Sequence, residues 1–314
     1  MDVLRSLDEA SRAEGLRGCA VAIGNFDGVH LGHQQLIRRA LELAHARGAR
    51  GAVLTFDPHP VRVLRPSVAP PVLTSLPRKL EILARLGVDA AVVQPFDREY
   101  ASSPAERFVA RDLAERLRAA EVVVGWDFTA GHDRARVAAL RPLMERHGIA
   151  LHVVEPVTSE GLVVSSTKIR EFLLQGKVEA AAELLTRPYD VDGEVVRGAG
   201  RGRGFGFATA NVGTDALLPA NGVYVVRAFL GAERRPYGGV CNVGVKPTVA
   251  PGGGVTAEVH LFDHDGGDLY GEPIRVAFLA RLRDERLFPS IDALRAQIAR
   301  DAEAARAALA ASGM

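Results

Sequence analysis

Short apolar runs alternate with amphipathic stretches over the first 185 residues of the chain. The apolar runs have the length of buried strands, and the stretches between them repeat their apolar positions with a helical period. We expect strands over residues 19–26, 51–58, 89–96, 121–125 and 150–157. We expect helices over residues 33–47, 77–86, 103–119 and 137–147. Buried strands that alternate with helices predict a parallel α/β sheet with helices on both faces.

The pattern changes after residue 185, where glycines become frequent and the apolar segments become short and bounded by turns. Strand-like segments lie at residues 192–196, 222–230, 238–244, 256–262 and 273–282. This spacing predicts an antiparallel barrel or sandwich. One amphipathic stretch, over about residues 290–309, predicts a helix that closes the chain. We therefore expect two domains, residues 1–185 and 186–314, which agrees with a prior of about 150 residues per domain.

Composition limits the partners and the compartment. The chain of 314 residues carries 39 basic and 38 acidic residues, so no excess charge favours nucleic acid or an anionic membrane. The two cysteines, Cys19 and Cys241, are too few for a disulfide framework and lack the spacing of metal ligands. No apolar run has the length of a membrane span, and the first residues lack the apolar core of a signal peptide. We expect a cytoplasmic protein without a nucleic-acid or membrane partner.

A first candidate site follows the first long predicted strand. The segment AIGNFDGVHLGHQQLI (22–37) reads as a strand, a glycine-containing turn and a helix that begins near His30 and His33. Free backbone N–H groups and the helix dipole make such a helix start favourable for anions, and two histidines three residues apart share one helical face. The pattern resembles the HxGH signature of nucleotidyltransferases. Two alternatives are a pair of zinc ligands that lacks the rest of its site, and ordinary surface histidines.

A second candidate segment is VVSSTKIREFLLQG (163–176). Ser165, Ser166 and Thr167 precede an amphipathic helix that carries Lys168 and Arg170. Hydroxyl groups at a helix start are usually only caps. Together with the upstream histidines, however, the segment matches the second ATP-phosphate motif of the same superfamily, in which cations stabilise the departing pyrophosphate. No Walker A loop is present and no GxGxxG follows a strand, which excludes the ordinary P-loop and dinucleotide folds.

The glycine-rich half contains two further candidates. The loop GAGRGRGFGFATANV (198–212) leads into Thr209 and Asn211, and such a loop can fold over phosphates with its backbone N–H groups and arginines. The alternatives are a solvated turn and an RNA-binding Gly/Arg segment. Glu258 lies between Ala257 and Val259 in a predicted strand, where a carboxylate facing the mouth of a barrel can act as a general base. A single strand glutamate is more often simply exposed to solvent.

Taken together, the motifs resemble one family, the prokaryotic bifunctional riboflavin kinases/FMN adenylyltransferases, also called FAD synthetases. In the first domain the resemblance rests on GNFDGVHLGH (24–33), TFDPHP (55–60), LTSLPRKLEILARLGVD (73–89), SPAERFV (103–109), VVGWDF (123–128) and SSTKIR (165–170). In the second it rests on residues 193–212, NGVY (221–224), NVGVKPT (242–248), EVHLFD (258–263), LYGEPI (269–274) and residues 282–301. The HxGH signature alone also fits pantetheine-phosphate and nicotinate-mononucleotide adenylyltransferases, which do not resemble the second domain.

The resemblance implies a Rossmann-like nucleotidyltransferase domain followed by a β-barrel kinase domain. It implies that riboflavin and ATP give FMN in the second domain, and that FMN and ATP give FAD and pyrophosphate in the first. In the kinase, Glu258 matches the base for the ribityl hydroxyl, Thr209 and Asn211 match the residues that hold Mg²⁺ and the ATP phosphates, and Gly204 matches an ATP contact. Self-association stays open.

For the adenylyltransferase, the resemblance implies catalytic roles for His30 and His33. The implied ATP contacts are Asn25, Phe26, Asp27, Gly28, Ser165, Ser166, Thr167 and Arg170. Flavin contacts are implied for Phe56, Asp127 and Arg283.

Three positions depart from the family pattern. Ala208 replaces a proline before Thr209, which removes a fixed φ angle. Ala130 stands where an aromatic side chain is common, and Arg136 stands where a glycine is common. The last two changes bear on FMN affinity in the first domain. Besides the bifunctional enzyme, two hypotheses therefore stay open, a riboflavin kinase with a weakened adenylyltransferase half and a flavin-sensing protein without turnover.

Overall fold

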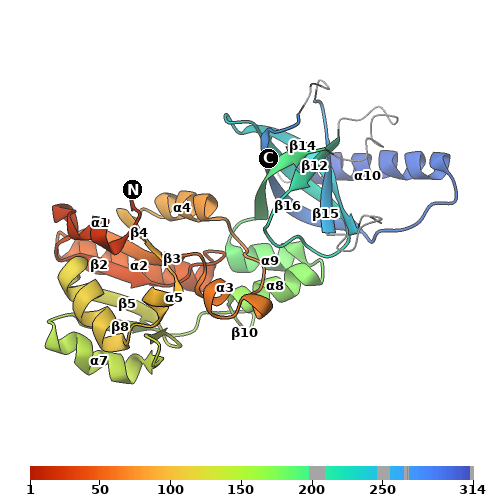
Figure 1. Ribbon diagram of the computed structural model, residues 1–314. Helices are drawn as coiled ribbons and strands as arrows, with labels where there is room; N and C mark the ends of the chain where they lie inside the picture. Colours follow the sequence, from red (N-terminus) through yellow and green to blue (C-terminus); the bar gives the residue numbers. More distant parts are fainter. Residues whose placement is uncertain (198–208, 246–254, 265–266, 268, 312–314) are drawn as a thin grey trace. The chain divides into compact units, whose positions relative to one another are not determined.

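The computed structural model describes residues 1–197, 209–245, 255–264, 267 and 269–311 of the chain. The chain divides into two compact units, whose helices and strands are labelled in Figure 1. The first unit contains Met1–Pro70 and Leu76–Ser165. The second contains the short segment Pro71–Ser75 together with Ser166–Met314.

A six-stranded sheet forms the centre of the first unit, with the strand order β1-β4-β3-β2-β5-β8. Every neighbouring pair of these strands is parallel, which confirms the predicted parallel sheet. The strands are β1 (Asp2–Leu4), β2 (Ala20–Ile23), β3 (Gly51–Asp57), β4 (Ala90–Pro95), β5 (Glu121–Gly125) and β8 (Ala150–Val154). The apolar pattern did not predict β1, because three residues give too short a run to stand out.

Helices cover both faces of the sheet, as predicted, because successive strand residues point to opposite faces. Val21 and Ile23 of β2 pack in one core with α1, the helical segment η3 and α7. Ala22 packs in a second core with α2 and α4. These helices are α1 (Leu7–Ser11), α2 (Leu31–Ala46), α4 (Leu76–Arg85), η3 (Phe108–Arg116) and α7 (Val137–Arg146).

The predicted helix over residues 103–119 is not a regular α-helix. After the short helix α6 (Ala105–Arg107), the segment η3 has the wider hydrogen-bonding pattern of a π-helix over its full length. Residue propensities do not distinguish α from π geometry, so the sequence gives no sign of this difference.

The first unit also contains several short elements. The short helices are η1 (Glu14–Leu16), α3 (Pro60–Leu64), η2 (Pro66–Val68) and α5 (Arg98–Ala101). Two hairpins pair β6 (Thr129–Ala130) with β7 (Ala135–Arg136) and β9 (Thr158–Ser159) with β10 (Leu162–Val163).

The second unit contains a closed antiparallel barrel with the strand order β11-β12-β15-β14-β13-β16. This settles the choice between a barrel and a sandwich, and closure leaves no open sheet edge. The strands are β11 (Tyr189–Val196), β12 (Thr209–Gly213), β13 (Gly222–Leu230), β14 (Arg235–Val245), β15 (Val255–Leu261) and β16 (Pro273–Arg283).

Three helices accompany the barrel. The closing helix α10 (Ile291–Ala311) confirms the expected terminal helix, and Figure 1 shows it beside the strands. Its Ala305 packs with Val223, Val225 and Val240 from β13 and β14. The helices α8 (Ser166–Leu174) and α9 (Val178–Leu185) pack against each other, and α9 also packs on β11 and β16.

The segment Pro71–Ser75 joins the second unit through several contacts. Val72 forms a parallel bridge with Ala216, and its carbonyl oxygen accepts a hydrogen bond of 3.0 Å from the backbone N–H of Leu217. The hydroxyl of Ser75 donates to Asp192 at 3.0 Å. Leu73 is fully buried. Residues from the first half of the sequence are therefore part of the unit that contains the barrel.

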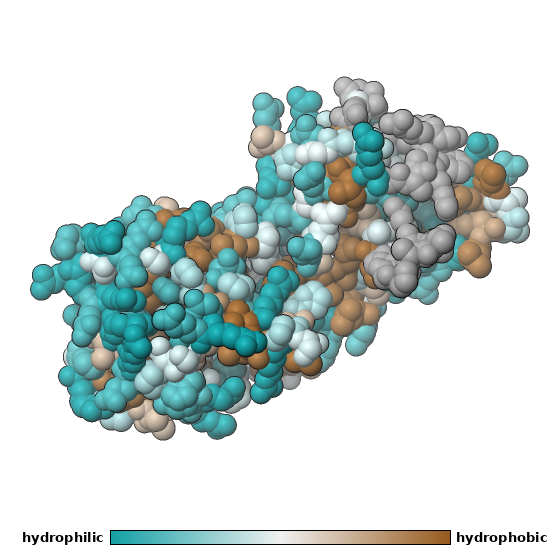
Figure 2. Space-filling view, in the orientation of Figure 1, coloured by the Kyte–Doolittle hydropathy of each residue, from teal (hydrophilic) through white to brown (hydrophobic). Residues whose placement is uncertain are grey.

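Hydrophilic side chains predominate on the face of the first unit that is visible in Figure 2, with apolar side chains in small groups. Within the described residues, none of the helices combines the length and the hydropathy needed to cross a bilayer.

Candidate active sites

The turn after β2 has an unusual backbone. Phe26 and Val29 adopt positive φ angles of 49° and 43°, and Gly28 has a φ of 87°. Positive φ is uncommon for residues with a side chain, and for β-branched Val29 it is a genuine outlier. The buried side chains of Phe26 and Val29 pack in the second core, which holds the turn in this geometry. Strained backbone of this kind is concentrated at functional sites.

His30 and His33 lie at the start of α2, as expected, and they contact each other. His30 is the N-cap, and its Nδ1 accepts a hydrogen bond of 3.3 Å from the backbone N–H of His33. The two imidazole rings stack with centroids 3.6 Å apart and an angle of 16° between their planes. A side chain at Gly32 would place its Cβ 3.2 Å from the ring of His30. Because Gly32 has no side chain, the ring of His30 has room to lie against the start of the helix.

The environment of His33 favours the neutral imidazole. Burial, followed by the nearby positive charges of His30 and Lys79, holds the pKa of His33 well below its usual value. Phe26 contacts the His33 ring edge-on, with ring centroids 5.3 Å apart. At neutral pH His33 is therefore uncharged, and a neutral imidazole can still donate one N–H to a phosphate oxygen.

Lys79 is a residue of this site that sequence reasoning missed. It lies in α4, and its Nζ donates to the carbonyl oxygen of Asn25 at 2.7 Å and to Thr55 Oγ1 at 3.5 Å. Burial lowers the pKa of Lys79, while the carboxylates of Asp27 and Asp57 act in the opposite direction. One signal in the sequence could have identified Lys79. It lies three residues before Ile82, on the face of α4 that is buried, and a lysine is rarely buried without a partner.

An aromatic cluster surrounds Phe56, the expected flavin contact at the end of β3. The ring centroid of Phe56 lies 5.6 Å from that of Phe96 and 6.2 Å from that of Tyr100. Asp127, the other flavin candidate of this unit, is exposed just after β5. Sequence reasoning missed Phe96, which directly follows β4, and Tyr100, which lies in α5.

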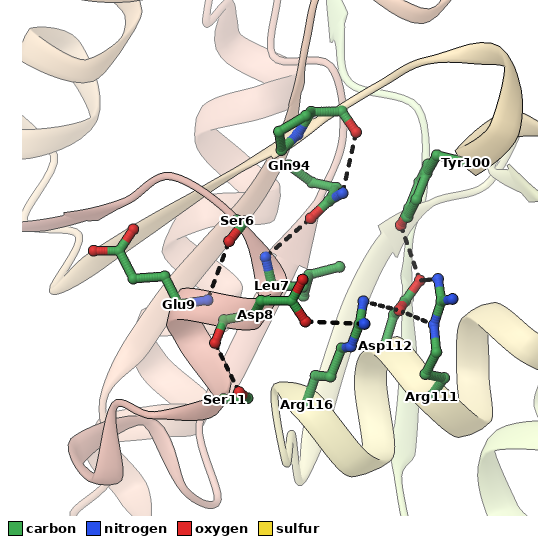
Figure 3. A network of polar contacts seen from close by, with 11 residues as sticks. Ser6, Leu7, Asp8, Glu9, Ser11, Gln94, Tyr100, Arg111, Asp112 and Arg116 are labelled. Carbon is green, nitrogen blue, oxygen red and sulfur yellow. Dashed lines mark hydrogen bonds and ion pairs between the residues drawn. The ribbon is translucent and has the colours of Figure 1, made fainter.

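A buried carboxylate anchors this cluster. Figure 3 shows the Tyr100 hydroxyl pointing at Asp112, to which it donates a hydrogen bond of 3.1 Å. Arg111 and Arg116 pair with the same carboxylate at 2.8 and 3.4 Å. Burial and the charge of Asp112 raise the pKa of Tyr100, so the phenol stays protonated and keeps donating.

The structure changes the interpretation of Ala130. We expected the missing aromatic at this position to affect FMN affinity, but Ala130 is 7% exposed and belongs to the core cluster that includes Phe108. The next residue, Gly131, is packed so closely that an added Cβ would lie 2.2 Å from the backbone nitrogen of Ala105. Arg136 pairs with Thr129 in the β6–β7 hairpin and precedes α7 as its N-cap.

The expected second ATP motif falls at the division between the units. Ser165 is the last residue of the first unit, and Ser166, Thr167 and Arg170 belong to α8 in the second. Nε of Arg170 donates to the carbonyl oxygen of Pro71 at 3.0 Å. Lys168 forms an ion pair with Glu171 on the same helix. The second motif is thus divided between the units, with Ser165 in the unit that contains His30 and His33.

The kinase candidates form a row across three strands of the barrel. Asn211 of β12 and Asn242 of β14 both pair with Glu258 of β15 in the strand register. Residues paired in an antiparallel ladder project on the same face of the sheet. Ala257 and Val259 are fully buried, while Glu258 between them is partly exposed, so Glu258 projects outward from the barrel wall. The role of Glu258 as a general base stays a prediction.

The remaining kinase candidates have varied positions. Thr209 begins β12 and pairs with His260. Gly204 and Ala208 lie outside the described residues. Arg283 ends β16 and makes an ion pair with Asp301 of α10, with Nη2 2.7 Å from Oδ2. Sequence reasoning missed Asn242 because its position beside Glu258 depends on the register of the barrel.

Clusters of metal-binding side chains were sought in the described part of the chain. No group of three or more His, Cys, Asp or Glu side chains there has the arrangement of a metal site. For the histidine pair, the observed contacts are ring stacking and helix capping.

Comparison with known proteins finds a different family model for each half of the chain. The family model for FAD synthetase matches residues 12–168, and the model for riboflavin kinase matches residues 185–309. A crystal structure described as a macrolide-efflux protein from Streptococcus pneumoniae has a TM-score of 0.84 and 32% sequence identity, and the match covers 98% of this chain and 99% of that one.

Curated relatives match over nearly the full length. The bifunctional riboflavin kinase/FMN adenylyltransferase of Escherichia coli (strain K12) is 38% identical over 308 residues, which are 98% of this chain and 97% of the relative. The protein of the same description from Haemophilus influenzae is 36% identical over 98% of this chain and 99% of its own length. The one from Bacillus subtilis is 37% identical over 91% and 90%. The chain belongs to the family of bifunctional riboflavin kinases/FMN adenylyltransferases.

Proposed function

We propose that the chain performs its two reactions at two separate sites, FMN synthesis on the barrel and FAD synthesis at the turn before α2. In the first reaction ATP phosphorylates riboflavin to FMN, and in the second FMN accepts the AMP part of ATP to give FAD and pyrophosphate. The observation that carries this proposal is the presence of two polar constellations, the stacked His30–His33 pair and the Asn211–Glu258–Asn242 row, in different compact units. We propose residues 1–185 and 186–314 as the functional division, which the family matches support.

At the barrel, we assign Glu258 as the general base. Its carboxylate is the acidic member of the row and is accessible on the outer face. It would accept the proton of the riboflavin 5′-hydroxyl while that oxygen attacks the γ-phosphorus of ATP, and the bond from the γ-phosphorus to the bridging oxygen of the β-phosphate would break with release of ADP. Phosphoryl transfer depends mainly on positioning and on neutralisation of charge, so the neighbouring Asn211 and Thr209 would hold the phosphates in line.

The donor atoms of Glu258, Asn211 and the nearby Thr209 suit Mg²⁺. The Thr209 hydroxyl, the Asn211 amide oxygen and the Glu258 carboxylate are oxygen donors, which this hard cation prefers. Thr209 and Asn211, which lie on the same strand and are two residues apart, would hold the ion. A magnesium ion there supplies positive charge for the phosphates of ATP.

At the turn before α2, we assign His30 and His33 to the ATP phosphates. An oxygen of the FMN phosphate would attack the α-phosphorus of ATP, and the bond to the β-phosphate would break with release of pyrophosphate. The neutral His33, the backbone of Asn25–Gly28 and the start of α2 supply donors where negative charge grows. Ser165, Ser166, Thr167 and Arg170 are proposed as further ATP contacts.

For the flavin, we propose Phe56 and Asp127 in the first unit and Arg283 in the second. The aromatic cluster around Phe56 supports the first, because an aromatic wall suits a planar isoalloxazine ring. Arg283 already pairs with Asp301, so its contact with flavin would add to a structural role. A cytoplasmic location and self-association stay predictions.

Product analysis by chromatography tests the assignment of two activities. The purified chain is incubated with riboflavin, ATP and Mg²⁺, and we expect FMN and FAD to accumulate. FMN without FAD would favour the weakened adenylyltransferase half. Neither product would favour a flavin-binding protein without turnover.

A further inference from the structure

The carbonyl oxygen of Asn25 accepts hydrogen bonds from two side chains of different elements. Nζ of Lys79 donates from α4 at 2.7 Å, and Oγ1 of Thr55 donates from β3 at 3.2 Å. The two donors are also within 3.5 Å of each other. Both are buried, so water does not compete for the acceptor. This carbonyl is therefore fixed from both α4 and the central sheet.

Asn25 is the residue that begins the strained part of the turn. Phe26, next to it, is the first residue with a positive φ angle, and the turn ends at His30. Only four residues separate Asn25 from the N-cap His30, so the position of the Asn25 carbonyl bears on the position of His30. Backbone in sparsely populated conformations persists only where the surroundings over-determine it, and Lys79 and Thr55 supply part of that restraint.

Lys79 also brings charge to the site. The charged and titratable groups that act on it or on His33 are Asp27 in the turn, Asp57 at the end of β3, and His30 on α2. Asp27 is buried like Lys79, so their attraction is weakly screened. An ammonium group here adds positive potential beside the start of α2, where the phosphates of ATP are expected.

We propose that Lys79 is a positioning residue of the adenylyltransferase site, which fixes the Asn25 carbonyl and with it the turn that presents His30 and His33. This proposal rests on the assignment of FAD synthesis to the two histidines. Burial is the main cause that lowers the pKa of His33, and the charge of Lys79 acts in the same direction.

The test compares Lys79→Met, Lys79→Arg and Thr55→Val in the full chain, with FMN and ATP as substrates. Lys79→Met removes the hydrogen bond and the charge, and we expect the kcat for FAD formation to fall by about 10²-fold, as for loss of one preorganised donor. Lys79→Arg keeps the charge and should recover part of that loss. Thr55→Val removes only the second donor to Asn25, and we expect a smaller loss, several-fold in size.

The pH profile separates positioning from a general structural defect. Loss of the Lys79 charge raises the pKa of His33, so in Lys79→Met the acid limb of FAD formation should move to higher pH. In Thr55→Val and Lys79→Arg the limb should stay in place. A loss that is uniform across pH in Lys79→Met, or a kcat within about threefold of the unchanged chain, would overturn the proposal.

Riboflavin phosphorylation is the internal control, since Glu258 and Asn211 lie in the other unit. It should be unchanged in all three variants. If Lys79→Met fails to fold, Thr55→Val decides, and an unaltered rate of FAD formation in that variant contradicts the proposal.

A His30→Ala/His33→Ala variant separates failure of this proposal from failure of the site assignment on which it rests. If that double variant still makes FAD, the assignment of FAD synthesis to the two histidines is wrong. If that double variant is inactive while the Lys79 variants are normal, only the role of Lys79 fails.

Discussion

Asn211 lies directly opposite Glu258 where β12 pairs with β15. The amide and the carboxylate therefore project from the same face of the barrel wall, which is the arrangement that a general base beside a phosphate-binding group requires. The strand register brings these two side chains together.

Glu258→Ala should abolish FMN formation and leave FAD formation from supplied FMN unchanged. Removal of a general base typically costs about 10²–10⁴ in rate. The measurement is chromatography of products with riboflavin or FMN as the starting flavin. Glu194→Ala is a matched control, because Glu194 is an exposed glutamate on another strand of the same barrel. An equal fall in FAD synthesis would mean that the two reactions do not use separate sites.

The double variant His30→Ala/His33→Ala should stop FAD synthesis while riboflavin phosphorylation continues. Each lost donor to the developing charge is expected to cost about 3 kcal/mol, mainly in kcat. Saturation curves for FMN and ATP check this. His45→Ala, an exposed histidine later on α2, serves as the control and should behave like the unchanged chain. Zinc in the unchanged protein that is lost in the double variant would instead support the metal-ligand interpretation.

Ala130→Phe should destabilise the first unit without tightening FMN binding. Ala130 is buried in the core, and overpacking of a core typically costs about 1–3 kcal/mol. We expect a lower unfolding temperature and no fall in the KM for FMN, with the KM for ATP little changed. Thermal unfolding and FMN saturation curves measure the two effects. A lower KM for FMN at unchanged stability would show that the position faces the flavin after all.

Neither cysteine should react in the folded protein. Cys19 and Cys241 are fully buried, and burial raises the pKa of both thiols, to about 12 for Cys19. A chromogenic disulfide reagent at pH 8 should label neither thiol in the native chain and both after denaturation. Because these pKa values are higher in the folded state, their contribution to stability is present below the ordinary thiol pKa of about 9 and is lost as the pH rises above it. Rapid labelling of the native protein at pH 8 would contradict this burial.

Much of the first unit was predictable from local pattern. The buried apolar runs and the helical period predicted the parallel sheet. The pattern of His30, Gly32 and His33 predicted the candidate site. Both signals lie within a few residues of sequence. The observed stacking of the two histidines brings together the N-cap His30 and a residue of the first helical turn, His33, which are only three positions apart.

Contacts between distant parts of the chain could not be predicted in the same way. Lys79 reaches Asn25 across 54 positions of sequence, and Arg283 reaches Asp301 across 18, so only the folded packing identifies these partners. Asn242 lies beside Glu258 because of the barrel register, and a shift of one residue would move it to the opposite face. Burial of Ala130 likewise depends on how the β6–β7 hairpin packs.

The contribution of Pro71–Ser75 to the barrel-containing unit affects how the two activities can be taken apart. No single cleavage of the backbone yields both units intact, since a fragment that starts at Ser166 lacks Val72, which forms a bridge with Ala216, and the buried Leu73. Exchange of the barrel-containing unit between relatives therefore requires transfer of two stretches of chain. A chain divided at one junction alone would leave this unit without Leu73 and with an exposed apolar gap in its place.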